Sequence, residues 1–545
     1  MTMQTVATLD LSIRATTALA WSPPANVLPG DAGRIVASFV DAAATALGRA
    51  THYNSRDEQQ RAELAAHEGL LRLDRALYSL LLTLPGVLDR ARQVGIKNLL
   101  STSVDSASRR VDAVDERRIL GALLDELPAP RLFKLFEGLK AGSPEEGIRK
   151  ANNARSRKLV LRTILSSPRI ELWAIKYRSK MRLALTHAWG VRMSSILRAI
   201  LAKDDALWSA KERSILHQEI DRHVSFDLAR AYACVGFVLG NRNRLGYPLL
   251  ASFEAAKRDI SAGERLPYEV LEGIRSVYHR ETPNAEVLRL TAHTLTRGQR
   301  MSVQRKAEEA QVDVRMDPAD YDAVRLYVYA FEMGLTEEIV RELREKARKA
   351  AQGFPARFAS IGILVDASAA MLGSGEQRLR PMATALALRD VLAQLGKART
   401  VYAGHTPAVG EDHLVRPSGD TSLAEGLMDL LEDGPEAIFV LSDGYENRPA
   451  GRFAELVTEL RSLGIGTPIY HLNPVFAAES GGVRELAPGL VPTLPAQRPE
   501  SLGLSFLRGM LEADPMRGIN ALIRLARPLS RGAVGADSHL SKGDA

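Results

Sequence analysis

The sequence predicts an all-helical N-terminal region followed by an α/β domain built on a parallel sheet. In residues 31–354, apolar residues recur three and four positions apart, with short Pro or Gly breaks between segments, as in successive helices. Beyond Pro355, strand-like and helix-like segments alternate, which is typical of a doubly wound α/β domain. A chain of 545 residues is too long for one core. We therefore expect an irregular lead at 1–30, a helical domain at 31–354, an α/β domain at 355–528 and a flexible tail at 529–545.

The helical region is expected to form a stacked array. Its clearest helical segments are Ala65–Thr83, Glu116–Leu127, Ala129–Leu139, Pro144–Leu165, Ser194–Ala202, Phe226–Leu239, Leu249–Ile260, Tyr268–Tyr278, Ala319–Met333 and Thr336–Ala351. Helices joined by short turns cannot each bury an apolar stripe alone, so pairs of them stack into an α-solenoid. Since no clean repeat is visible, the array is HEAT-like at most, open or closed into a ring. A compact, irregular helical domain is the alternative.

The α/β region is expected to alternate strands with covering helices. The expected strands are Phe358–Val365, Arg399–Tyr402, His413–Arg416, Ala437–Leu441 and Pro468–Leu472. The expected helices are Pro381–Leu395, Ser422–Leu431, Arg452–Leu463 and Pro499–Leu511. Ala437–Leu441 is a continuous apolar run, as strands buried on both faces require.

Hydroxyl and carboxylate side chains follow two of these strands and precede one helix. Asp366 and Ser368 come directly after the first strand, Thr421 precedes a helix, and Asp443 follows Ala437–Leu441. Open α/β sheets bind ligands in crevices at the carboxyl ends of their strands. Oxygen ligands of this kind suit Mg²⁺ or another hard divalent cation. The sequence therefore predicts a cation site, with helix caps as the alternative role for these side chains.

The pattern Asp366-x-Ser368-x-Ala370, together with Thr421 and Asp443, resembles the metal-ion-dependent adhesion site (MIDAS) of von Willebrand factor A (vWA) domains. That family's first loop is D-x-S-x-S, so Ala370 stands where the family has a hydroxyl ligand. The resemblance implies a Rossmann-like domain in which Ser368 and Thr421 touch the metal and Asp366 and Asp443 act through bound water. It also implies capture of an acidic residue of a protein partner, such as an ATPase of the MoxR type.

Basic residues crowd between Arg149 and Arg213, with Trp173, Tyr177 and Trp189 interleaved. Such a mixture can bind phosphates and stack on unpaired bases of RNA. The candidate RNA-binding residues are Arg149, Lys150, Arg155, Arg157, Lys158, Lys176, Arg178, Lys180, Arg182 and His187. The alternative is a solvated helix face whose long basic side chains cover apolar surface.

The segment Trp173–Lys180, followed by Leu185-Thr186-His187, resembles part of the Ro autoantigen family. Members of that family place a helical-repeat ring, the TROVE module, before a C-terminal A-type domain. The resemblance implies a ribonucleoprotein that binds small structured or misfolded RNA, and no DNA partner is expected. In the alternative, the helices are only a scaffold and the chain is a protein-interaction adaptor without RNA.

Composition and missing motifs narrow the function further. The 46% hydrophobic and 25% charged residues describe an ordinary globular protein, and the formal net charge of +7 is compatible with a polyanionic partner. The single cysteine, Cys234, excludes internal disulfides. No signal peptide or apolar membrane span is recognisable, so a cytoplasmic protein without a membrane partner is expected. The sequence has no phosphate-binding Gly-Lys loop, no nucleophile elbow and no His-Glu-x-x-His zinc motif, so we expect a protein that is not an enzyme.

Overall fold

The computed structural model describes residues 21–46, 55–101, 116–140, 151–352, 357–373, 378–404, 414–477, 482–499 and 502–531. Contacts group the chain into two compact units. The first, here called the sheet unit, comprises residues within 1–95, 105–123 and 317–535. The second, here called the helical unit, lies mainly within 124–316. This grouping differs from the predicted division at residue 355, because it places the N-terminal helices in the same unit as the sheet. The domain bounds 31–354 and 355–528 stay a prediction.

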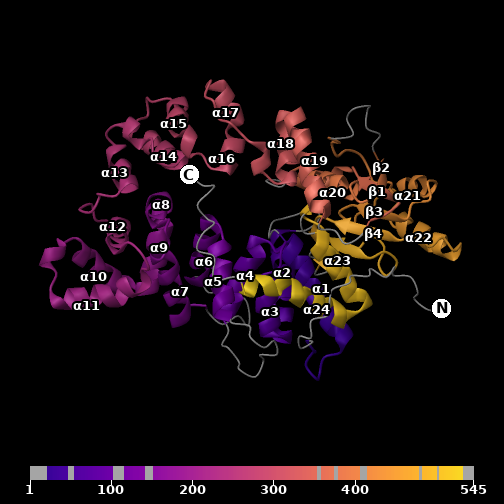
Figure 1. The fold of residues 1–545 in the computed structure, drawn as a ribbon, viewed down its shortest axis with the longest axis horizontal. Coiled ribbons are helices and arrows are strands. Elements are labelled where there is room, and N and C mark those ends of the chain that lie inside the picture. The colour runs from indigo at the N-terminus through magenta and orange to yellow at the C-terminus, as the bar shows by residue number, and fades with distance from the viewer. Residues whose placement is uncertain are drawn as a thin grey trace. The chain divides into compact units, whose positions relative to one another are not determined.

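A parallel sheet of five strands forms the centre of the sheet unit, drawn mostly in orange in Figure 1. Its strands, in the order β2-β1-β3-β4-β7, are β2 (Lys397–Ala403), β1 (Ser360–Asp366), β3 (Ala437–Leu441), β4 (Ile469–Asn473) and β7 (Thr493–Pro495). All four pairings are parallel. The short antiparallel pair β5 (Phe476–Ala477) and β6 (Gly482–Val483) follows β4. Because the strands are parallel, their carboxyl ends meet at one edge.

The helices of the sheet unit come from both ends of the chain. The N-terminal group is α1 (Pro29–Thr45), α2 (Arg56–Leu73), α3 (Arg75–Leu81), α4 (Asp89–Ser101) and α5 (Glu116–Glu126). The last residues of α4 and α5 are grouped with the helical unit. The C-terminal group is α18 (Ala323–Met333), α19 (Glu337–Gln352), α20 (Arg380–Leu392), α21 (Leu423–Leu431), α22 (Arg452–Ser462), α23 (Leu502–Ala513) and α24 (Pro515–Arg531). Leucine, valine and phenylalanine side chains of α21 and α22 cover one face of β1 and β3. Such covering is what a buried parallel sheet requires.

Helix α1 packs against α23 and α24, so the first described helix and the last two described helices meet inside the sheet unit (Figure 1). Arg508 of α23 forms a buried ion pair with Asp41 of α1, with both N···O distances of the fork at 3.0 Å. The backbone N–H of Trp21 donates to the Asn520 side chain of α24 at 2.9 Å. These contacts join residues more than 450 positions apart in the sequence.

Helix α24 is absent from the predicted elements, and its last turn occupies residues 529–531 of the expected tail. The sequence analysis assigned no element to this segment, in which Pro515, Gly518 and Pro528 are residue types that usually interrupt helices. Pro515 instead occupies the first helical position, where its missing N–H costs nothing. Ile519 and Leu522 bury the apolar side of this helix.

Short helices joined by short connections make up the helical unit, drawn from purple to red in Figure 1. They are α6 (Ala129–Lys140), α7 (Ala154–Leu165), α8 (Ile170–Lys176), α9 (Arg178–Trp189), α10 (Val191–Leu201), α11 (Ala210–Glu219), α12 (Leu228–Leu239), α13 (Pro248–Ala255), α14 (Tyr268–Tyr278), α15 (Asn284–Thr291), α16 (Arg297–Ser302) and α17 (Gln304–Glu309). Most contacts join helices that are close in sequence, such as α7 with α9 and α14 with α15. Cys234 is buried in α12, and burial raises the pKa of its thiol, which makes the thiol unreactive.

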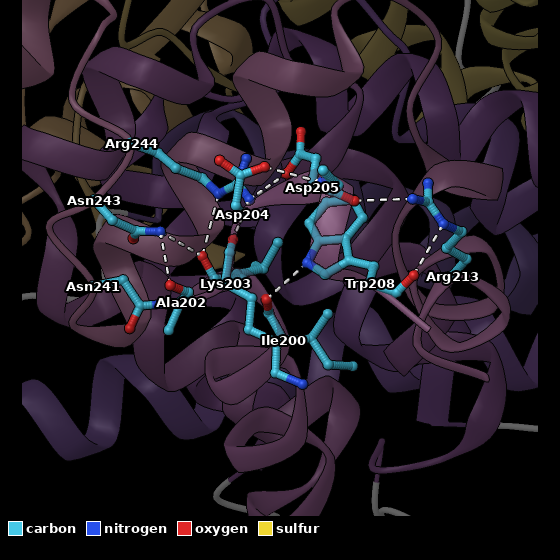
Figure 2. A network of polar contacts seen from close by, with 12 residues as sticks. Ile200, Ala202, Lys203, Asp204, Asp205, Trp208, Arg213, Asn241, Asn243 and Arg244 are labelled. Carbon is cyan, nitrogen blue, oxygen red and sulfur yellow. Dashed lines mark hydrogen bonds and ion pairs between the residues drawn. The ribbon is translucent and has the colours of Figure 1, made fainter. Parts of the chain in front are cut away.

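A polar network closes the C-terminal end of α10 (Figure 2). Carbonyl groups at a helix end have no partner within the helix and must find one elsewhere. Asn243 and Arg244 donate to the carbonyl of Leu201 at 3.1 and 3.2 Å, and the Trp208 indole donates to that of Ile200 at 2.9 Å. The Arg244 guanidinium also lies 5.2 Å from the centre of the Trp208 ring. The basic and aromatic side chains of this segment therefore stabilise the helix end.

The predicted class, an α region with an α/β region, is confirmed in this coarse form. One predicted strand was wrong: Leu414–Arg416 form no strand, and His413 lies outside the described residues. Arg416 instead donates to the carbonyl of Phe331, which draws this segment toward α18 rather than along the sheet. Among the described residues, no helix combines the length and the apolar character that crossing a membrane would need.

Candidate functional site

The four side chains predicted to hold a cation gather at the carboxyl edge of the sheet. Asp366 ends β1 and Asp443 follows β3, its immediate neighbour. The backbone N–H of Ser368 donates to Asp366 Oδ1 at 2.9 Å, and the Thr421 hydroxyl lies 3.4 Å from the same oxygen. All four residues are buried. The fold therefore brings two carboxylates and two hydroxyls into one small polar site.

Ser442 is a fifth member of this site that the sequence analysis did not single out. Its hydroxyl donates to Asp366 Oδ2 at 2.8 Å and accepts the backbone N–H of Gly444 at 3.1 Å. Ser442 thus joins the β1 carboxylate to the loop that carries Asp443. Its place between a buried strand and Asp443 was the signal that could have identified it.

Close backbone contacts fix the loop that carries Thr421. Ser418 N–H donates to the Ala367 carbonyl at 2.8 Å, and Ala369 N–H donates to the Gly419 carbonyl at 3.0 Å. Gly404, at the end of β2, has a φ of +77° and faces the same loop. A Cβ at this position would lie 2.3 Å from the carbonyl oxygen of Asp420. Gly404 is therefore required for both its backbone angle and the close approach of the loop.

Buried side chains behind Asp443 hold its loop in place. Asn473, at the end of β4, donates to the carbonyl of Asp443 at 2.9 Å. His471 Nε2 lies 3.0 Å from the Ser442 carbonyl, and its Nδ1 lies 2.9 Å from the Thr493 hydroxyl. Burial lowers the pKa of His471 to about 4, so this imidazole is neutral at pH 7 and donates from Nε2. Its role is to position the loop, because both ring nitrogens are engaged.

Burial dominates the electrostatics of the two carboxylates. It raises the pKa of Asp443 to about 7, with a further rise from the nearby charge of Asp366. It also raises the pKa of Asp366, against the hydrogen bonds that Ser368, Ser442 and Thr421 offer. Two buried carboxylates that repel each other gain strongly from a positive charge between them.

The residues fit a hard divalent cation. Ser368 Oγ is buried and, among the described atoms, finds no hydrogen-bond partner of good geometry, although it lies close enough to Asp366 to influence its pKa. A buried hydroxyl without such a partner is costly unless something else binds it. Ala370 is half-buried and offers only a methyl group. Within the described ranges, no group of three or more His, Cys, Asp or Glu is placed to bind a metal, so any cation here depends on hydroxyl oxygens as well.

The candidate RNA-binding residues separate into exposed and packed side chains. Arg149 and Lys150 lie outside the described residues. Arg157 and Lys158 of α7 and Lys180 and Arg182 of α9 are exposed. Arg155 of α7 is half-buried, and so is His187 of α9, whose pKa is lowered by burial and by the charges of Arg157 and Lys140.

The side chains of Lys176, Tyr177 and Arg178 mainly contact other residues of the helical unit. Lys176 Nζ lies 3.3 Å from a Glu269 carboxylate oxygen. Arg178 donates to the Phe237 carbonyl at 3.1 Å, and its guanidinium lies 4.5 Å from the centre of the Phe237 ring. The half-buried guanidinium of Arg178 has a lowered pKa because it is desolvated and lies near Arg242.

The interleaved aromatic residues also pack internally. Trp173 and Tyr177 both lie against Phe133, with ring centres 5.5 and 5.4 Å apart. The Trp189 indole donates to the carbonyl of Glu219 at 3.3 Å. These contacts account for the three rings as structural elements of the helical unit.

Comparison with known proteins identifies no family for this chain. The sequence matches no protein-family model, and no significant match to a curated protein was found.

Proposed function

We propose that this chain is a non-catalytic binding protein whose sheet unit holds a divalent cation and captures an acidic group of a partner. The observation that carries this proposal is the buried pair Asp366 and Asp443, accompanied by the hydroxyls of Ser368 and Thr421. The pair lies where β1 and β3 are neighbours, at the point where the strand order reverses. Open α/β sheets bind ligands at such switch points.

The same features support a vWA-type domain. The strand order β2-β1-β3-β4-β7 is doubly wound, and the three loops that resemble the adhesion site converge on one edge. Ser368 and Thr421 would hold Mg²⁺ directly, and Asp366 and Asp443 through water, as the resemblance implies. The cation would supply coordination for a carboxylate oxygen of the partner. His471 is engaged at both nitrogens, so its imidazole is not placed to act as a base.

Mn²⁺ titration, followed by calorimetry or electron paramagnetic resonance, tests the cation site. Asp366→Ala is expected to weaken Mn²⁺ binding by about 100-fold, because the buried carboxylate orients the hydroxyl ligands. Ala370→Ser is expected to strengthen binding by about tenfold, because a fixed hydroxyl replaces a water. Asp420→Ala is the matched control: this carboxylate is adjacent to Thr421 but exposed. Equal Mn²⁺ affinity in wild type and Asp366→Ala would exclude this site.

We infer RNA binding by the helical unit as a second candidate function. Exposed basic side chains of α7, α9 and α10 support it, since Lys158, Arg162, Lys180, Arg182 and Arg192 form no ion pair with the described acidic residues. The succession of short helices agrees with a HEAT-like, TROVE-like array. The partner class is a small structured or misfolded RNA.

Two double variants separate RNA contact from structural support. Lys180→Ala with Arg182→Ala is expected to weaken binding of a stem-loop RNA with a single-stranded end and to reduce the salt slope by about 2. Its melting temperature should stay that of the wild type, because both side chains are exposed. Lys176→Ala with Arg178→Ala should instead lower the melting temperature, because these side chains pack internally. Filter binding between about 50 and 200 mM salt measures the slope. An unchanged slope in the first variant would rule out this surface.

A further inference from the structure

Arg484 lies beside the candidate cation site and comes from a segment that the sequence analysis left unassigned. It directly follows β6, and its guanidinium carbon lies 3.9 Å from the centre of the Tyr445 ring. Tyr445 in turn donates its backbone N–H to Asp443 Oδ1 at 3.1 Å. The Arg484 guanidinium therefore lies against a residue, Tyr445, that is itself hydrogen-bonded to the Asp443 carboxylate.

Two backbone contacts fix this neighbourhood. The buried Asn473 amide donates to the carbonyls of both Asp443 and Arg484, at 2.9 Å each. Gly444 has a φ of +85°, and a Cβ there would lie 2.7 Å from the Arg484 carbonyl oxygen. The loop after β3 and the loop after β6 are thus held together as one rigid rim. The backbone of Arg484 therefore keeps a constant place beside Asp443.

The charge of Arg484 reaches the site. It lowers the pKa of Asp443, although burial and Asp366 act in the opposite direction with a larger effect. The Tyr445 ring covers one face of the guanidinium, and a guanidinium binds a planar carboxylate through its edge rather than its face. Arg484 is half-buried, so a ligand at the rim can touch it.

We propose that Arg484 determines ligand specificity at the Asp366–Asp443 site by binding a second carboxylate of the captured ligand. The preferred ligand is then an acidic peptide segment with two neighbouring carboxylates, one for the cation and one for Arg484. This inference rests on the proposed cation-dependent capture. The inference specifies the class of ligand: a segment with paired acidic side chains rather than a single one.

Removing the charge of Arg484 should change Mn²⁺ binding and peptide binding in opposite directions, which makes the inference testable. Its positive charge repels a bound cation, so Arg484→Gln is expected to strengthen Mn²⁺ binding by about threefold. The same substitution removes the partner of the second carboxylate and should weaken binding of a doubly acidic peptide by about tenfold. A purely structural role would weaken both.

The experiment uses the full chain loaded with Mn²⁺ and two fluorescent peptides that differ only in carrying Asp-Asp or Asp-Asn at their centre. Wild type is expected to bind the Asp-Asp peptide about tenfold more tightly, and Arg484→Gln to lose this preference, while Arg484→Lys keeps part of it. Fluorescence polarisation measures the ratio, and Mn²⁺ titration of each variant reports the site itself.

Three outcomes would overturn these claims separately. An unchanged peptide ratio in Arg484→Gln, with Mn²⁺ bound, removes the specificity role and leaves the cation site standing. Mn²⁺-loaded wild type that binds neither peptide contradicts both the inference and the capture of acidic groups. Wild type that fails to bind Mn²⁺ contradicts the proposed function at its first step.

Discussion

Replacing Arg508 by Ala is expected to lower the free energy of unfolding of the sheet unit by about 3 to 5 kcal/mol. Arg508 and Asp41 are 8% and 4% exposed in their side chains, and the guanidinium binds both carboxylate oxygens. Removing the arginine takes a counter-charge away from the buried Asp41 carboxylate, which is costly in a medium of low polarity. Urea unfolding followed by circular dichroism measures the loss, and amide hydrogen exchange should show that α1 loses protection first.

A double variant and an exposed pair serve as controls. Asp41→Leu with Arg508→Met removes both charges and should recover most of the stability, because apolar side chains of similar size can replace a buried ion pair. Arg34→Ala breaks the exposed pair of Arg34 with Asp31 and should change the stability by less than about 1 kcal/mol. An Arg508→Ala protein as stable as Arg34→Ala would show that α1 is not anchored through this pair.

Raising the pH from about 5 to about 8 without divalent cations is expected to destabilise the sheet unit through Asp443. The folded chain holds the Asp443 proton up to a pKa of about 7, whereas the unfolded chain releases it near the usual aspartate value of 3.8. The folded state therefore binds more protons between these values, and its stability falls as the pH rises through that window. A difference of about 3 between the two pKa values corresponds to about 4 kcal/mol at most.

Mg²⁺ should reverse this loss above pH 7, where Asp443 has released its proton and the cation gains most, and should have little effect near pH 5. Thermal melting with Mg²⁺ or with a chelator at each pH measures the difference. Asp443→Asn is the control, because the amide keeps the shape of the carboxyl group without its titration. If the Asn variant shows the same pH and Mg²⁺ dependence as wild type, the site does not cause it.

Part of the candidate site could be predicted because it depends on local chain features. Asp366, Ser368 and Asp443 follow apolar runs that are strands, and the carboxyl ends of parallel strands share an edge. Arg484 could not be predicted, since it reaches the site through a hairpin and an Asn473 contact that leave no periodic pattern. Likewise, the sequence shows a run of basic residues, but only packing separates the internal Lys176 and Arg178 from the exposed Lys180 and Arg182.

By itself, the sequence determined the succession of helices followed by alternating strands and helices, and the placement of hydroxyls and carboxylates at strand ends. These features follow from the spacing of apolar residues and from turn residues, which act over a few positions. Only the tertiary structure decided that α1 packs with α23 and α24 and that Asp41 pairs with Arg508. Contacts between distant segments depend on complementary shape and on pairing of buried charges, and neither leaves a signal in a single sequence.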